Sequence, residues 1–269
     1  MRKLFKSKKT VLTAIIFLIA FTASYGQLSA PGLGKGKTAS WFAFGVKQSL
    51  DSLQKKESMT YIGIGRKSTL DDTNPFNKMA ILVLNQEFSN RYAKNWQYSY
   101  AISYRRQNEY ESTAPYETAD PAIKQEFRIY GRYSYLTGNN RLKWKNTFRQ
   151  EYRKFFNPDF TKSDEDYQFR TRLKTQLNVD LGTQKLHHII GSAEALFSIS
   201  KEHSPKSEWT KFDYKESRFA LYYSLTPREI PFTFDFGYAY NLIGKGAKTS
   251  GVHYLAIDVI WNNPFGKTF

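Results

Sequence analysis

The segment Trp96–Tyr104 reads WQYSYAISY and alternates strictly between large apolar side chains and small or polar ones. A helix would scatter the aromatic rings around its circumference. A β-strand instead puts Trp96, Tyr100 and Tyr104 on one face and the two serines on the other. The segment therefore predicts a strand with one apolar face and one polar face.

The same period of two continues along the chain. One parity is aromatic or aliphatic in residues 127–135, 169–179 and 232–240. The ten strands expected from these patterns cover approximately residues 59–66, 77–88, 95–106, 123–136, 141–154, 166–181, 186–200, 212–225, 231–241 and 251–262. Several of them reach the length of about 9–11 residues that crosses a bilayer along a tilted path.

A further segment, Thr38–Val46, alternates through Phe42, Phe44 and Val46. Counted alone it makes eleven strands, an odd number that bacterial single-chain barrels avoid. Two interpretations stay open. Either the segment lies in the periplasm or plugs the barrel, which leaves ten strands, or it pairs with a partner near Gln48–Met59, which makes twelve.

The opposite parity of the strands carries charge. Its basic residues are Arg128, Arg132, Lys143, Lys145, Arg149, Arg153, Arg170, Arg172 and Lys174. Its acidic residues are Glu126, Glu151, Asp180, Glu194, Glu216, Asp235 and Asp258. Burying such charges unpaired in a dry core costs several kcal/mol each, so this face must be wet or densely paired. The lumen of a barrel meets both conditions and turns the apolar parity toward lipid.

Connection lengths and composition also favour a membrane barrel, which has short periplasmic turns and longer external loops. Short links are expected at residues 137–140, 182–185 and 226–229. Longer polar stretches cover Gln107–Pro121, Phe156–Glu165, Lys201–Lys211 and Ile243–Gly251. Aromatic residues make up 17% of the chain, which suits girdles at both membrane interfaces. The expected fold class is all-β, an antiparallel transmembrane β-barrel of 10–12 strands.

The N-terminus has the features of a secretory signal peptide. Five basic residues between Arg2 and Lys9 precede the apolar run Val11–Ala23, which is too short to span a bilayer comfortably as a helix. We expect residues 1–26 to be removed near Gly26, residues 27–58 to form an N-terminal segment with one candidate strand, and residues 59–269 to form the barrel. Removal of the five basic residues lowers the net charge from +16 to +11. Export to the outer membrane makes nucleic acid an unexpected partner despite this charge.

The middle and C-terminal parts resemble an uncharacterised family of outer-membrane barrels, domain of unknown function family 2490. The resemblance covers roughly residues 40–262 and rests on the strands Trp96–Arg106, Arg141–Arg153, Tyr167–Leu177 and Phe232–Tyr240. It implies a barrel fold and an outer-membrane location but no catalytic residues. Phe269 at the C-terminus resembles the terminal aromatic signal that the barrel assembly machinery recognises.

No catalytic residue, metal site or cofactor is predicted. The chain has no cysteine, which excludes disulfides and thiolate chemistry. Gly36-Lys37-Thr38 matches the end of a phosphate-binding loop, but no strand precedes it, and we interpret the stretch from Pro31 as a flexible N-terminus. His187 and His188 are adjacent, so on a strand they point to opposite faces and cannot hold one ion together.

Three functions remain under consideration. The first is a non-enzymatic outer-membrane barrel with a charged, largely salt-bridged interior, with outer-membrane lipid and the assembly machinery as partners. The second is a narrow anion-selective pore or anion-binding barrel, because basic residues on the inner parity could contact small anions. The contact residues expected in that case are Arg128, Arg132, Lys143, Lys145, Arg149, Arg170, Arg172 and Lys174. The third is a lipid-modifying enzyme.

Overall fold

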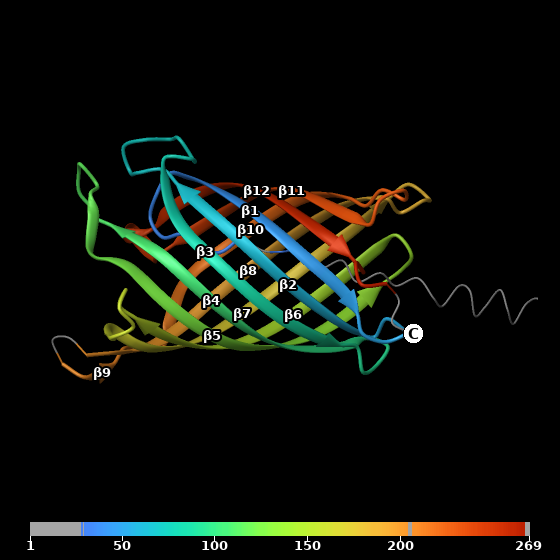
Figure 1. Ribbon diagram of the computed structural model, residues 1–269, viewed down its shortest axis with the longest axis horizontal. Coiled ribbons are helices and arrows are strands. Elements are labelled where there is room, and N and C mark those ends of the chain that lie inside the picture. The colour runs from blue at the N-terminus through green and yellow to red at the C-terminus, as the bar shows by residue number, and fades with distance from the viewer. Residues whose placement is uncertain (1–27, 29, 204–205, 267–269) are drawn as a thin grey trace, which may run out of the picture.

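The computed structural model describes residue 28, residues 30–203 and residues 206–266, and the expected signal peptide and Phe269 lie outside this part of the chain. Long strands form a single sheet that curls into a barrel (Figure 1). They are β1 (Thr38–Ser49), β2 (Lys56–Lys67), β3 (Lys78–Asn90), β4 (Trp96–Tyr110), β5 (Thr118–Gly138), β6 (Leu142–Phe156), β7 (Lys162–Leu181), β8 (His187–Glu202), β10 (Asp213–Leu225), β11 (Phe232–Ile243) and β12 (Ser250–Asn262). The short strand β9 (Glu208–Trp209) extends the end of β8, and a 3₁₀ turn, η1 (Gly246–Lys248), precedes β12. All ten expected strands are confirmed, with ends shifted by a few residues.

The barrel closes at two places. β8 pairs with β10 antiparallel, past the short β9, and β1 pairs with β12 in parallel. Eleven strands of the described chain therefore form the wall, which confirms the expected all-β barrel of 10–12 strands, although the count is neither of the two even alternatives, ten or twelve. When strands alternate in direction and their number is odd, the first and last run the same way and can only close in parallel. The barrel is thus antiparallel except at this one seam.

The candidate strand at Thr38–Val46 belongs to the wall and needs no extra partner. As β1 it pairs with both β2 and β12, so the wall begins at Thr38 and the boundary expected at residue 59 falls inside β2. Glycines allow close packing here: a Cβ on Gly63 would lie 2.2 Å from the indole of Trp41. Inside the barrel, Trp41 donates a hydrogen bond from Nε1 to Asp258 of β12 at 3.0 Å, across the seam.

The two ends of the barrel differ. One, the turn end, carries connections such as residues 50–55 and 139–141, and the other, the loop end, carries residues 68–77 and 111–117. Two stretches expected as long loops are about half strand, because β4 and β5 continue pairing as far as Tyr110 and Thr118, and β6 and β7 as far as Phe156 and Lys162. Pairing beyond the barrel body satisfies backbone groups that a loop would expose.

The outward face is apolar around the wall. Exposed aliphatic side chains such as Ile102, Ile129 and Leu173 occupy the middle of the strands. Aromatic rings gather at both ends: Trp96 packs on Tyr133 and Tyr135 near the turn end, while Tyr152 stacks on Tyr167 near the loop end. This is the arrangement expected of interface girdles. Among the described residues, no helix is long and apolar enough to cross a membrane.

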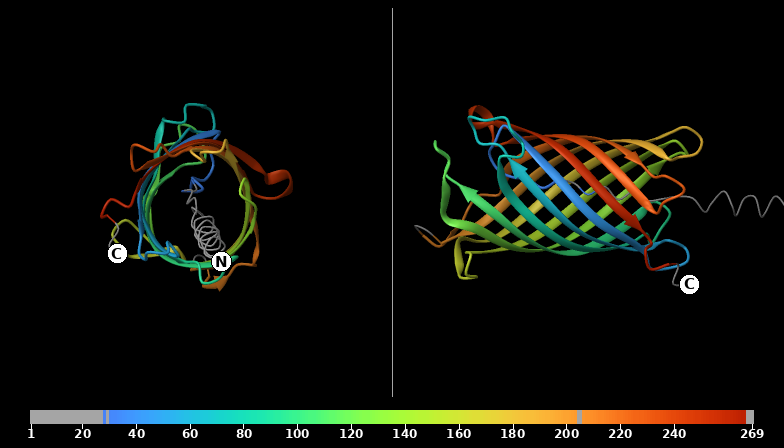
Figure 2. Two further views of the ribbon diagram at one scale, coloured as in Figure 1. Left: turned by 90° about the vertical axis from the view of Figure 1, so that its right-hand side faces the viewer. Right: turned by 45° about the horizontal axis from the view of Figure 1, so that its top comes forward.

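The chain before β1 runs through the barrel interior. We call Leu28 and residues 30–37 the lumen segment; Figure 2 shows part of it inside the barrel when the molecule is seen end-on. Leu33 is only 1% exposed, its N–H donates to the Tyr254 hydroxyl at 3.0 Å, and its carbonyl accepts from Lys67 at 3.1 Å. The interpretation of this stretch as a flexible N-terminus was therefore wrong. Long-range apolar packing in the lumen, which local composition does not reveal, holds it.

Candidate functional site

The barrel interior has two unlike sides. Beside the lumen segment, buried side chains of β1, β3 and β12, such as Trp41, Ile81 and Val252, form one apolar cluster with Leu28 and Leu33. On the opposite side, β4 to β8 direct arginine, lysine and glutamate side chains inward. The alternation of each strand determines this, because the apolar parity faces outward and the charged parity therefore faces the lumen.

A dense network of ion pairs joins β5, β6 and β7. Arg128, 1% exposed, lies 2.6 Å from Glu126 and 3.0 Å from Glu151. Arg153 forms an ion pair with Glu126 at 2.5 Å, and Arg172 forms one with Glu151 at 3.0 Å. Each carboxylate therefore meets more than one guanidinium. This compensates the desolvation that isolated buried charges would suffer.

The network continues toward β8 and β3. Arg172 also reaches Glu194 on β8 at 2.5 Å, and Arg132 reaches Glu87 on β3 at 3.2 Å. The guanidinium of Arg149 lies 3.6 Å from the centre of the Tyr130 ring, a cation–π contact that desolvation strengthens. The interior is thus held by charge pairing rather than by an apolar core on this side.

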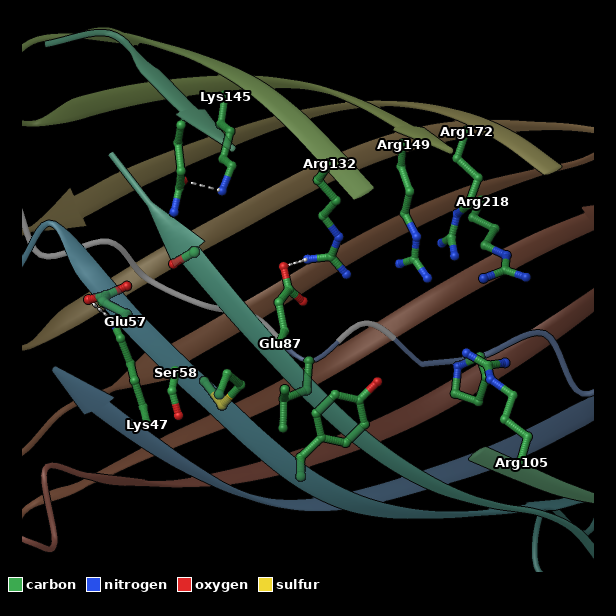
Figure 3. Close-up of a pocket in the computed structure, with 16 residues that line it drawn as sticks. Lys47, Glu57, Ser58, Glu87, Arg105, Arg132, Lys145, Arg149, Arg172 and Arg218 are labelled. Atoms are coloured by element: carbon green, nitrogen blue, oxygen red, sulfur yellow. Dashed lines mark hydrogen bonds and ion pairs between the residues drawn. The ribbon is translucent and has the colours of Figure 1, made fainter. Parts of the chain in front are cut away.

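A cavity of about 100 Å³ lies between the network and the lumen segment (Figure 3). Of its sixteen lining residues, seven are basic and two are acidic. The basic residues are Lys47, Arg105, Arg132, Lys145, Arg149, Arg172 and Arg218, and the acidic ones are Glu57 and Glu87. Leu28 and Pro31 of the lumen segment form part of its wall. The cavity is therefore small, strongly cationic and bounded on one side by the chain's own N-terminal part.

Arg105 differs from the other lining arginines. It makes no ion pair with any described residue, and its Nε–H has no hydrogen-bond acceptor there. Its cross-strand neighbour Glu126 already binds Arg128 and Arg153. In Figure 3, Arg105 reaches into the cavity from the side opposite Arg149, Arg172 and Arg218. A guanidinium without an ion pair among the described residues thus faces a group of arginines across the cavity.

The structure separates the eight basic residues that the sequence singled out. All eight lie on the inward parity, but only Arg132, Lys145, Arg149 and Arg172 line the cavity. Arg128 is enclosed in the ion-pair network. The other three lie elsewhere along the lumen: Lys143 pairs with Asp180 at 3.1 Å, Arg170 lines a recess toward the loop end, and Lys174 lies on the inner side of β7 beyond the cavity lining.

Sequence reasoning missed Lys47, Arg105 and Arg218 as cavity residues. Arg105 continues the inward parity of Ser99 and Ser103, so extending the alternation past Tyr104 would have found it. Arg218 shares the parity of Glu216, which was assigned to the inner face. Lys47 depended on β1 being a wall strand, which the sequence left open.

The two adjacent histidines point to opposite faces, as expected. His187 contacts the Tyr223 hydroxyl at 2.6 Å on the outer side, whereas His188 is buried inside with Nδ1 2.9 Å from Asp180. Among the described residues, no three histidine, aspartate or glutamate side chains gather as a metal site. No protein-family model matches the chain, and no curated protein matches it either.

Proposed function

We propose that this protein is a non-enzymatic outer-membrane β-barrel whose interior is closed by its own charge network and lumen segment. The observation that carries the proposal is that the distribution of side chains is the reverse of that in a soluble protein. Apolar and aromatic side chains cover the outside of the wall, and ion pairs fill much of the inside. A soluble protein gains nothing from exposing Ile102, Ile129 and Leu173 together, whereas a bilayer solvates them.

Two further features support an outer-membrane location. The wall strands are 12 to 21 residues long, enough to cross a bilayer when tilted. Closure leaves no wall strand with an unpaired long edge, which the hydrocarbon interior demands because it offers no hydrogen-bond partners. The proposal includes a cleaved signal peptide, contacts with outer-membrane lipid and the assembly machinery, and the family resemblance described above.

Membrane fractionation and gel mobility test this proposal. Expressed with its N-terminus intact, the protein should pellet with outer membranes. It should also migrate differently in gels with and without heating, because a folded barrel resists detergent unfolding. Recovery in the soluble periplasm would contradict the location. Release of fatty acid from phospholipid or lipopolysaccharide by the purified barrel would contradict the non-enzymatic part.

A second candidate function is binding or passage of small anions through the lumen. The excess of basic over acidic residues around the central cavity favours it. Planar-bilayer recordings distinguish the two interior functions. A closed barrel shows no steady conductance, whereas anion-selective steps would indicate a pore.

A further inference from the structure

We propose that the central cavity binds a small multivalent oxyanion of the phosphate or sulfate class, with Arg105 as its principal anchor. This inference rests on the second candidate function and adds the class of ligand and the residue that anchors it. It does not require that the lumen conduct ions.

The side chains that line the cavity carry an excess of positive charge. Seven basic side chains line the cavity, and only Glu57 and Glu87 among its lining residues are acidic. Lys47 pairs with Glu57 at 3.0 Å, and Arg132 pairs with Glu87 at 3.2 Å, so these two acids are already engaged. Buried positive charge without a counterion is unfavourable. A bound anion would compensate Arg105, whose guanidinium has no ion pair with any described residue.

The arginine side chains approach the cavity from opposite sides. Arg105 comes from β4, while Arg149, Arg172 and Arg218 come from β6, β7 and β10 on the other side of the cavity (Figure 3). Arg149 and Arg172 are each more than nine-tenths buried. Guanidinium groups donate planar pairs of N–H groups that match the oxygens of phosphate, sulfate or carboxylate. A tetrahedral oxyanion has oxygens pointing in several directions, so it can present an oxygen pair to guanidinium groups on both sides at once.

Size narrows the ligand class. Pockets for organic molecules usually occupy about 300–1,000 Å³, whereas this cavity is about 100 Å³. Nucleotides and sugar phosphates are therefore too large, and a halide has no pair of oxygens to accept the two parallel N–H groups of a guanidinium. The cavity lies on the inner side of the wall, with Leu28 and Pro31 of the lumen segment among its lining residues, whereas the proposed lipid contacts are on the outer side. The source must be a free oxyanion in aqueous solution.

Titration calorimetry of the folded barrel in detergent tests the inference, with inorganic phosphate and sulfate as probes and chloride as the competitor. The wild-type chain should bind phosphate or sulfate, and Arg105→Gln should weaken binding at least tenfold. Arg106→Gln is the matched control, because Arg106 follows Arg105 on the same strand but faces outward. The affinity of this variant for phosphate or sulfate should equal that of the wild-type chain. Arg105→Lys keeps the charge but loses the planar fork, and its affinity should lie between the two.

Several results would overturn the inference. One is that a wild-type chain with heat-dependent gel mobility binds no oxyanion. Another is that the Arg105 and Arg106 variants lose the same amount of oxyanion affinity. The third is that chloride at equal concentration displaces the bound oxyanion. Gel mobility checks that each variant folds, and if Arg105→Gln does not fold, Arg105→Lys decides. Failure of the outer-membrane proposal is recognised separately by fractionation of the cell envelope, because calorimetry on the folded barrel does not depend on location.

Discussion

At the scale of single residues, chemically identical side chains have opposite consequences. Arg128 forms ion pairs with two carboxylates, whereas Arg105 forms none with any described residue. Truncating a partner in a buried ion-pair network leaves other charges uncompensated. Truncating a lone cation removes repulsion from its neighbours instead. The structure therefore predicts different effects for substitutions that composition alone would treat as equivalent.

Arg128→Met should destabilise the barrel by about 3–5 kcal/mol, because Glu126 and Glu151 lose a shared partner inside the lumen. Urea unfolding of the barrel in detergent micelles measures this. Arg141→Met is the control, since Arg141 is exposed in the turn before β6. Equal stability of the Arg128 and Arg141 variants would contradict the network as a source of stability.

Gly63→Val should destabilise the barrel by about 1–3 kcal/mol, because the added side chain overlaps the indole of Trp41 and displaces its hydrogen bond to Asp258. Gly191→Val is the matched control: that glycine lies on a wall strand with nothing within 4 Å of an added Cβ. Thermal unfolding of the two variants in the same detergent gives the comparison. A loss confined to Gly191→Val would refute the packing argument.

At the scale of elements, the proposed function gives the lumen segment the role of closing the interior. Its fixed points are the buried Leu33 side chain and the bonds of the Leu33 backbone to Tyr254 and Lys67. These partners lie on β12 and β2, next to the seam. The segment therefore covers the apolar side of the lumen, while the charged side opposite is held by its own ion pairs.

Leu33→Asn should release the segment and produce steady ion conductance in planar bilayers, since a buried amide without a designed partner is unfavourable there. Lys35→Asn introduces the same side chain at an exposed position of the segment and should leave the bilayer silent. Conductance by the wild-type chain, or by both variants alike, would show that the segment does not close the lumen.

The strands were predictable from sequence, and the lumen segment was not. Alternation in segments such as Trp96–Tyr104 depends on local side-chain period, so it identified the strands and the inward direction of Arg132 and Arg172. Pairing between particular charges depends on register across neighbouring strands, which one sequence does not reveal. The place of Leu33 depends on β12, more than 200 residues away along the chain.

At the scale of the whole molecule, apolar side chains cover the outside of the wall and charged ones line the inside. This distribution predicts how the protein responds to a new charge on its outer surface. Leu173→Arg, on the outward face of β7, should weaken folding into lipid vesicles by about 2–4 kcal/mol. Leu173 is 50% exposed, and Leu53, in the turn between β1 and β2, is 70% exposed. Leu53→Arg should therefore be neutral. A soluble protein would tolerate both changes, so tolerance of both in vesicle-folding measurements would contradict the membrane proposal.

The number of wall strands could not be predicted from local sequence patterns. The period of β1 was visible in Phe42, Phe44 and Val46, but the preference of bacterial barrels for even counts argued against counting it alone. The number of wall strands follows from which strands meet at closure. The parallel register of Thr38 with His253 and of Lys47 with Asn262 is a long-range property that no local segment encodes.

The parallel seam also limits how the wall could be reconnected. β1 starts at the loop end and β12 finishes at the turn end, so the two wall termini lie a full strand length apart. A strand of 12 residues spans about 40 Å at roughly 3.3 Å per residue. In an even-stranded barrel a hairpin turn could fuse first strand to last, and the chain could be circularly permuted at any loop. Here such a fusion needs a linker as long as the barrel, along the path through the pore that the lumen segment already occupies.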